Sequence, residues 1–480
     1  MNQIKLILSD YTLLGILLGV MAFLFLIFVM STIGLEAQYL VLLSVLPIGA
    51  WVFWKFCSNK YYFAILLVSA IYIGGVLSSA EDGGLPVTPF QVLLVLGIFL
   101  FGLRMLHSAD FDIRTTGFEL IIAIFLGYIF FSLIYSVNPL SGFLEVFRMI
   151  ALFLFVILIL NSVYTSRQII ILLTVATLFG TVLAAASVIT SLLNPEIAAL
   201  NYLLEGRGIA SRAAIGDADP NFFATIFFIP IAFTASILHS KADNKFRVLA
   251  LFTLIVLIGG ALSTYSRSAW VAIFLIGAII VYHYKNLKIA SAIAVLFIVL
   301  VAFVPDLRIA LAGVINRVVD IFAGNVDTSS KMRIVLGQVA IRMFLDNVFL
   351  GVGFRSFPIE FDKRNTAYGM LEVSEPHNIT YMILSELGLI GIFLFSIILF
   401  FLIRLAYRNL KMSRVDTYQR IIASTLFSSL IGYLMFHQFI PRFFTNNTMY
   451  LNIALIFVHH YYLLGFNKPD GKIMTAGIKE

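Results

Sequence analysis

YTLLGILLGVMAFLFLIFVM, residues 11–30, carries no charged side chain. A bilayer core about 30 Å thick is crossed by a helix of roughly 20 mostly apolar residues. The run therefore predicts a transmembrane helix. Lys5 precedes it and no small-residue cleavage site follows it, so we interpret it as a retained first helix and not as a signal peptide.

Similar runs recur along the whole chain, whose residues are 61% hydrophobic and only 12% charged. This composition excludes a water-soluble globule with a polar surface. The runs stay apolar throughout, whereas barrel strands alternate over about ten residues, so the runs predict helices. The predicted spans are 11–31, 39–56, 61–79, 88–104, 118–136, 143–161, 168–193, 220–239, 247–265, 268–284, 288–304, 378–403, 421–439 and 448–466. The predicted fold class is thus all-α, a polytopic membrane bundle of about fourteen helices with one long external loop.

Positive charge predicts the orientation of this bundle. The segments on the same side of the membrane as the amino terminus hold 19 of the 32 Lys and Arg residues, and the segments on the opposite side hold the remaining 13. By the positive-inside rule, both termini are expected in the cytoplasm. The formal net charge of +7 then mostly reflects the positive residues that orient the helices in the membrane. It does not by itself support a nucleic-acid partner. Cys57 is the only cysteine, which excludes an internal disulfide, and no Cys/His cluster has the spacing of a zinc site.

The chain divides into four predicted parts. They are amino-terminal helices at 1–204, a second group of helices at 205–304, an external loop at 305–377, and carboxy-terminal helices with a cytoplasmic tail at 378–480.

The external loop has a helical pattern from Lys331 to Val348, with Val335, Val339, Phe344 and Val348 on the apolar face. This amphipathic helix is expected to lie on the membrane surface or to cap the bundle. After it, Gly351 and Gly353 permit a tight turn or a close backbone approach to a ligand.

Several arginines of the external side lie in short loops or beside membrane ends. Arg267 occupies the hairpin 263–268 between two predicted spans, Arg212 lies in the loop 194–219, and Arg442 follows the thirteenth span. The planar arginine fork suits phosphate, which an outward-facing membrane protein meets mainly in lipid headgroups and lipid-linked pyrophosphates. We therefore predict anion capture. The alternative interpretation is interfacial snorkelling or a structural pair with a nearby acid.

The external loop closes with Ser-Glu-Pro-His-Asn-Ile at residues 374–379. Pro376 and Asn378 are typical helix-start residues, so His377 is expected at a helix amino terminus that faces outward. Such an end attracts anions through its free N–H groups. Glu375 is a candidate for orienting His377, although it could simply be solvated.

Four sequence blocks resemble the O-antigen ligase and O-antigen polymerase superfamily. The blocks are Asp-Pro-Asn-Phe-Phe at 219–223, Thr-Tyr-Ser-Arg-Ser-Ala-Trp at 264–270, Leu-Asp-Asn-Val-Phe-Leu-Gly-Val-Gly at 345–353, and Pro-His-Asn-Ile-Thr-Tyr at 376–381, which continues into Glu-Leu-Gly-Leu-Ile-Gly at 386–391. The resemblance covers roughly residues 205–400. The earlier spans match in hydrophobicity alone, and the chain has two more predicted spans than these ligases usually show.

The resemblance implies a multi-pass enzyme of the bacterial inner membrane that acts at the outer face. Its substrates would be an undecaprenyl-pyrophosphate-linked glycan and a glycan or lipid acceptor. In this family the loop histidine and arginines near the membrane are functional, which implicates His377, Arg267 and Arg333. The spacing from Arg342 to Gly353 is similar to an arginine-glycine spacing of the polymerases. We therefore favour a polymerase over a ligase and add Arg342 to Arg267, Arg333 and Arg212 as candidates for binding the pyrophosphate.

The expected chemistry fits these residue types. A pyrophosphate-activated sugar already carries its leaving group, so neither a metal nor another cofactor is required. Arginines can hold the pyrophosphate, and a histidine can activate the acceptor hydroxyl. The alternatives are a lipid-linked glycan flippase, which would place charges near the bilayer midplane, and a non-catalytic component of a polysaccharide export complex. Membrane lipids and other polysaccharide assembly proteins are further expected partners.

Overall fold

The computed structural model describes residues 59–77, 88–108, 113–193, 220–264, 266–288, 291, 328–364, 375–414 and 416–466. Within these ranges all regular structure is helical. The elements are α4 Lys60–Leu77, α5 Pro89–Ser108, α6 Glu119–Ser132, α7 Pro139–Leu160, α8 Ser166–Leu193, α10 Pro220–Phe223, η2 Ala224–Phe227, α11 Phe228–His239, α12 Asn244–Ser263, α13 Arg267–Tyr284, α16 Thr328–Asp346, α17 Phe357–Arg364, α18 Ile379–Met412, α19 Thr417–Phe436, η3 Phe443–Thr445 and α20 Asn447–Leu463.

The predicted all-α polytopic membrane protein is confirmed. Six described helices are long and apolar enough to cross a bilayer by length and composition, and three shorter apolar helices accompany them. Each predicted span that falls on described residues overlaps an observed helix. The predicted spans 11–31, 39–56 and most of 288–304 lie outside the described residues, so the total of about fourteen stays a prediction.

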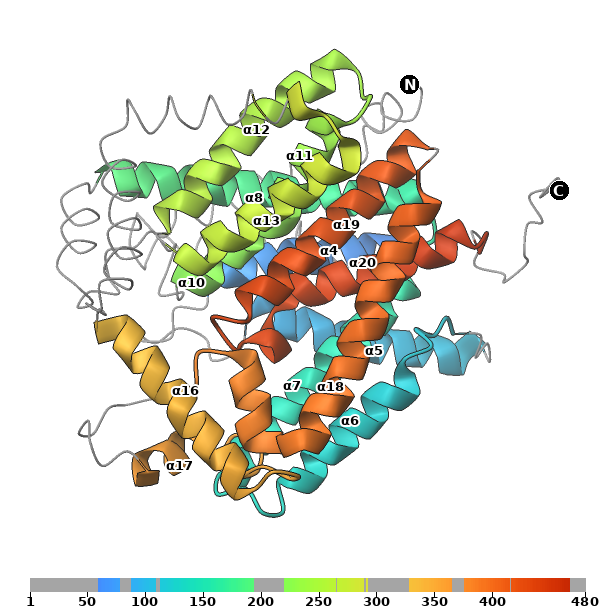
Figure 1. The fold of residues 1–480 in the computed structure, drawn as a ribbon. Coiled ribbons are helices and arrows are strands. Elements are labelled where there is room, and N and C mark those ends of the chain that lie inside the picture. The colour runs from blue at the N-terminus through green and yellow to red at the C-terminus, as the bar shows by residue number, and fades with distance from the viewer. Residues whose placement is uncertain are drawn as a thin grey trace, which may run out of the picture.

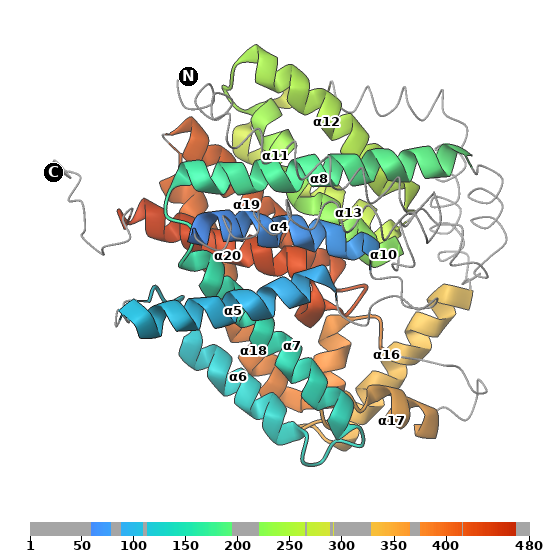
Figure 2. The ribbon, with the colours of Figure 1, turned by 180° about the vertical axis from the view of Figure 1, so that it is seen from behind.

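Helix α11 lies at the centre of the bundle. It packs on α8, α12, α13 and α19, and all its residues except Ile237 are buried. A helix that is apolar all round is expected in such an interior position. Figures 1 and 2 show α4, α5, α8 and α20 running beside one another along one side of this core. Small polar side chains join the helices, such as Ser424, whose hydroxyl donates to Ser236 Oγ over 2.9 Å.

Helix α18 is not the single straight span that the sequence predicts. Gly388 has φ 62° and ψ −158° inside it, and the helix bends there. Figure 1 shows a short first section that meets a long second section at an angle. The chain segment at 348–353 fills the break, because Leu389 N–H donates to Val348 O at 2.8 Å and Val352 N–H donates to Ser385 O at 2.9 Å.

Helix α16 packs against α18, and its placement on the membrane surface or as a cap of the bundle stays a prediction. Its buried side chains pack with Phe357 and Phe361 of α17, and Gly337 lies against the ring of Tyr381. The predicted apolar face was partly wrong. The buried residues of α16 are Leu336, Val339, Ala340 and Met343, whereas Val335 and Phe344 are only partly buried and Val348 lies beyond the helix end.

Candidate functional site

One end of the bundle gathers the segments that carry the candidate site. Ile379 N–H, at the start of α18, donates to His437 O at 3.1 Å, just after the end of α19. Asn378 Nδ2 donates to Gln438 O at 2.8 Å. The guanidinium of Arg442 lies over the ring of Phe222 in α10, 5.8 Å from its centroid. The start of α18, the end of α19 and α10 therefore meet around one site.

His377 is exposed at this end of the bundle, directly before α18. Its backbone is left-handed, with φ 51°. The next residue, Asn378, caps the helix because its Oδ1 accepts from Tyr381 N–H at 3.0 Å. The predicted helix start is thus observed. The cap and the bond to Gln438 fix the backbone on which the imidazole stands.

Beside His377 lies a cluster of charged residues that sequence analysis only partly identified. Glu375 pairs with Arg355 across 3.5 Å. Burial raises the pKa of the Glu375 carboxyl, and the positive charges of Arg442 and Arg355 oppose that shift. The carboxylate of Glu145 on α7 also acts on Glu375 and is itself paired with Arg148 at 3.2 Å. The arrangement places three guanidinium groups around two carboxylates.

Arg355, like Glu145 and Arg148, was not assigned from the sequence. It lies 20 residues from Glu375 in the chain, and its backbone is left-handed with φ 61°. The signal that could have found it is its position directly after the Gly-Val-Gly-Phe turn at 351–354. A cationic side chain held next to a rigid turn is well placed to contact an anion.

Gly351 and Gly353 fasten this turn to the break in α18. Both have positive φ, 71° and 96°. Gly351 N–H donates to Asn347 O at 2.8 Å, and Gly353 N–H donates to Glu386 O at 2.9 Å. These donors are therefore engaged within the protein. The glycines allow close backbone packing and position Arg355, instead of offering N–H groups to phosphate.

Glu386 lies two residues before the break and is 2% exposed. Its Oε1 accepts from Phe357 N–H at 3.0 Å, two residues after Arg355. Within the described part of the chain, its Oε2 is buried without a hydrogen-bond partner. The bond from Phe357 compensates part of the cost of burying this carboxyl group and ties the segment that follows Arg355 to α18.

The structure places the remaining predicted site residues as follows. Arg267 is the first residue of α13 and is partly buried. Arg333 is exposed on α16, one turn before the Gly337 contact with Tyr381, and Arg342 is exposed more than one turn after it. Arg212 lies outside the described residues. His377, Asn378 and Glu375 are thus brought together, while Arg333 and Arg342 flank the α16 contact at opposite ends.

Comparison with known proteins identifies the central region. A family model described as O-antigen ligase matches residues 249–396. This region belongs to the O-antigen ligase superfamily. No curated protein matches the sequence. The O-antigen ligase domain includes Arg267, Arg355, Glu375, His377 and Glu386, whereas Arg442 and Glu145 complete the cluster from outside it. The match supports an enzyme of the O-antigen ligase or polymerase type in general, acting on a lipid-linked glycan and an acceptor.

Within the described residues, no group of three or more His, Cys, Asp or Glu side chains could hold a metal ion. The described residues of the site offer imidazole, guanidinium and carboxyl groups.

Proposed function

We propose that this protein transfers a glycan from undecaprenyl pyrophosphate to an acceptor hydroxyl at the outer face of the inner membrane. The observation that carries this proposal is the exposed His377 on a capped helix start, next to the Arg355, Glu375 and Arg442 cluster. The cluster lies at the end of a membrane bundle, where a lipid-linked substrate would place its pyrophosphate.

In the proposed reaction the acceptor oxygen attacks the anomeric carbon of the glycan. A new C–O bond forms while the bond from the anomeric carbon to the pyrophosphate oxygen breaks. Undecaprenyl pyrophosphate leaves with the bonding electron pair, and the acceptor proton passes to the imidazole of His377. The arginines stabilise the charge that grows on the leaving pyrophosphate. Arg355 and Arg442 join Arg267 and Arg333 as proposed pyrophosphate-binding residues.

Glu375 has a proposed positioning role in this reaction. Its carboxyl contacts Arg355 and is influenced by Arg442, so it can fix the two guanidinium groups relative to His377. Burial raises the pKa of the Glu375 carboxyl group above that of an exposed glutamate, and the nearby guanidinium groups oppose this shift.

Between the two acceptors we favour another glycan repeat, which makes the protein a polymerase. Support comes from the interval between Arg342 and Gly353. In the structure, Arg342 lies in the last turns of α16, and Gly353 lies in the turn that precedes Arg355.

Arg267 offers a test of pyrophosphate binding by arginine. We expect Arg267→Lys to lower glycan transfer at least about tenfold, because an ammonium group retains the charge but cannot reproduce the bidentate fork. Transfer is measured with purified lipid-linked glycan. Arg404→Lys is the matched control, since Arg404 is exposed near the opposite end of α18. Full activity of the Arg267→Lys protein would assign Arg267 a structural role.

Orientation in the membrane is a second proposal, based on the charge distribution. Lys363 on α17 is exposed near the candidate site, and Lys285 is exposed at the other end of α13. After replacement of the single Cys57, we expect Lys363→Cys to react with a membrane-impermeant thiol reagent in intact spheroplasts. Lys285→Cys should react only after the membrane is opened. The reverse pattern would place the candidate site in the cytoplasm and contradict the proposed function.

A further inference from the structure

A second basic site lies at the end of the bundle opposite to His377. Helix α19 carries Arg420 in its first turn and ends just before His437, whose carbonyl accepts from Ile379 N–H at the candidate site. Helix α13 packs along α19 and spans 18 residues, from Arg267 to Tyr284. At 1.5 Å per residue this length is about 27 Å, close to the thickness of a bilayer core. At its far end, a cavity of about 330 Å³ is lined by Tyr282, His283, Tyr284, Lys285, Arg414 and Arg420.

The cavity is strongly cationic. Three of its six lining residues are Lys or Arg, and none is Asp or Glu. Among the described residues, Arg414 and Arg420 form no ion pair with a carboxylate, and no side-chain hydrogen bond is formed by Arg414. Cations gathered around a cavity without neutralising acids repel each other, and an anion relieves that repulsion.

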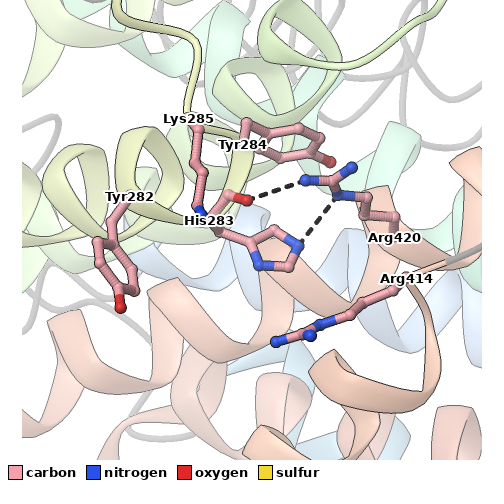
Figure 3. A pocket seen from close by; sticks show the side chains of 6 residues that line it. All are labelled: Tyr282, His283, Tyr284, Lys285, Arg414 and Arg420. Carbon is pink, nitrogen blue, oxygen red and sulfur yellow. Dashed lines mark hydrogen bonds between the residues drawn. The ribbon is translucent and has the colours of Figure 1, made fainter.

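Arg420 is held in a fixed position in this cavity. Its Nε donates to His283 Nε2 at 3.2 Å and its Nη2 donates to His283 O at 2.9 Å. The guanidinium also lies over the ring of Tyr284, 4.5 Å from its centroid. Figure 3 shows Arg420 between Tyr284 and His283, with the Arg414 guanidinium on the other side of the imidazole.

These contacts leave binding capacity at the cavity. A guanidinium has five N–H donors, and the described contacts of Arg420 use two of them. The Nε2 atom of His283 accepts this bond and therefore carries no proton, so the imidazole ring is uncharged. The free donors of Arg420, with Arg414 and Lys285, suit a tetrahedral oxyanion.

We propose that this cavity binds a phosphate group. Two sources share this chemistry, namely the headgroup of an anionic membrane lipid and a soluble phosphate compound. The tyrosines Tyr282 and Tyr284 are typical of a membrane interface, and basic pockets between helices at such a level bind phosphate headgroups. The site is independent of the glycan-transfer site, because the length of α13 separates them.

The test measures thermal stabilisation of the full-length protein in a neutral detergent. One arm adds short-chain phosphatidylglycerol, with phosphatidylcholine of equal chain length as the zwitterionic reference, and another arm adds inorganic phosphate. We expect saturable stabilisation in at least one anionic arm and none from phosphatidylcholine. Stabilisation by phosphatidylglycerol alone identifies a lipid site, and stabilisation by inorganic phosphate identifies a soluble ligand.

Two arginine variants link any binding to this cavity. Arg414→Gln removes a cation that has no described structural contact, so the protein should fold normally and bind the anion about tenfold more weakly. Arg404→Gln, on α18 and outside the cavity, should bind as tightly as the unmodified protein. The proposal is overturned if neither anion stabilises the protein, or if Arg414→Gln and Arg404→Gln bind the anion equally.

Discussion

Replacement of His377 by asparagine is expected to lower glycan transfer at least about a hundredfold, the lower range for loss of a general base. Asparagine is the most informative substitute because it tolerates the left-handed backbone at φ 51°. It can also form hydrogen bonds, but it cannot take up a proton at neutral pH. His377 is exposed, so the variant should accumulate normally. The measurement is transfer from purified lipid-linked glycan, with donor binding followed in the same preparation.

Asp362→Asn, at an exposed position of α17, is the control for this experiment and should transfer glycan normally. Near-normal transfer by the His377→Asn protein would refute the assignment of His377 as the base. Loss of both transfer and donor binding would instead make His377 a residue that positions the substrate.

Gly388→Ala is expected to destabilise the protein by about 2–6 kcal/mol. Backbone strain at such a glycine conformation costs about 1–3 kcal/mol, and overpacking adds about 1–3 kcal/mol. The Cβ atom would lie 2.5 Å from Phe349 O and 2.7 Å from Gly351 N, both backbone atoms that cannot easily move. The turn that positions Arg355 would be displaced. Thermal unfolding and protease resistance in detergent measure the effect.

Gly127→Ala is the matched control, because nothing lies within 4 Å of a Cβ atom at Gly127 in α6. This variant should be as stable as the unmodified protein or slightly more stable. Equal stability of the Gly388→Ala and Gly127→Ala proteins would show that the break in α18 does not depend on glycine.

Hydropathy predicted the described helices well because lipid requires long apolar runs with satisfied backbone groups. It did not predict the break in α18. Leu-Gly-Leu-Ile-Gly at 387–391 is apolar throughout, and hydropathy carries no information on φ and ψ. The break depends on backbone contacts with residues 348–353, which are distant in the sequence.

The helix at 328–346 shows a second limit of sequence patterns. The prediction treated this segment as an amphipathic helix with one apolar face, which would contact lipid or protein while the other face contacts water. The observed face is rotated toward Leu336 and Met343, because Gly337 allows close approach of the Tyr381 ring. A hydropathy pattern does not identify small residues such as Gly337, which allow a neighbouring side chain to approach the helix backbone.

His377 and its cap were accessible from sequence, since helix-start residues form a local pattern. The pairing of Arg355 with Glu375 was not, because it depends on how the turn at 351–354 docks into α18. The glycines gave a correct indication of a close backbone approach. Gly351 approaches the backbone of Glu386, and Gly353 approaches the backbone of Ser136.

Product analysis of the reconstituted protein tests the proposed glycan transfer most directly. The protein is incubated with undecaprenyl-pyrophosphate-linked glycan and acceptor, and both products are identified by mass. The proposed function predicts an acceptor enlarged by the transferred glycan, with one undecaprenyl pyrophosphate released for each transfer. Movement of intact lipid-linked glycan across the membrane without any covalent product would contradict it and favour a flippase.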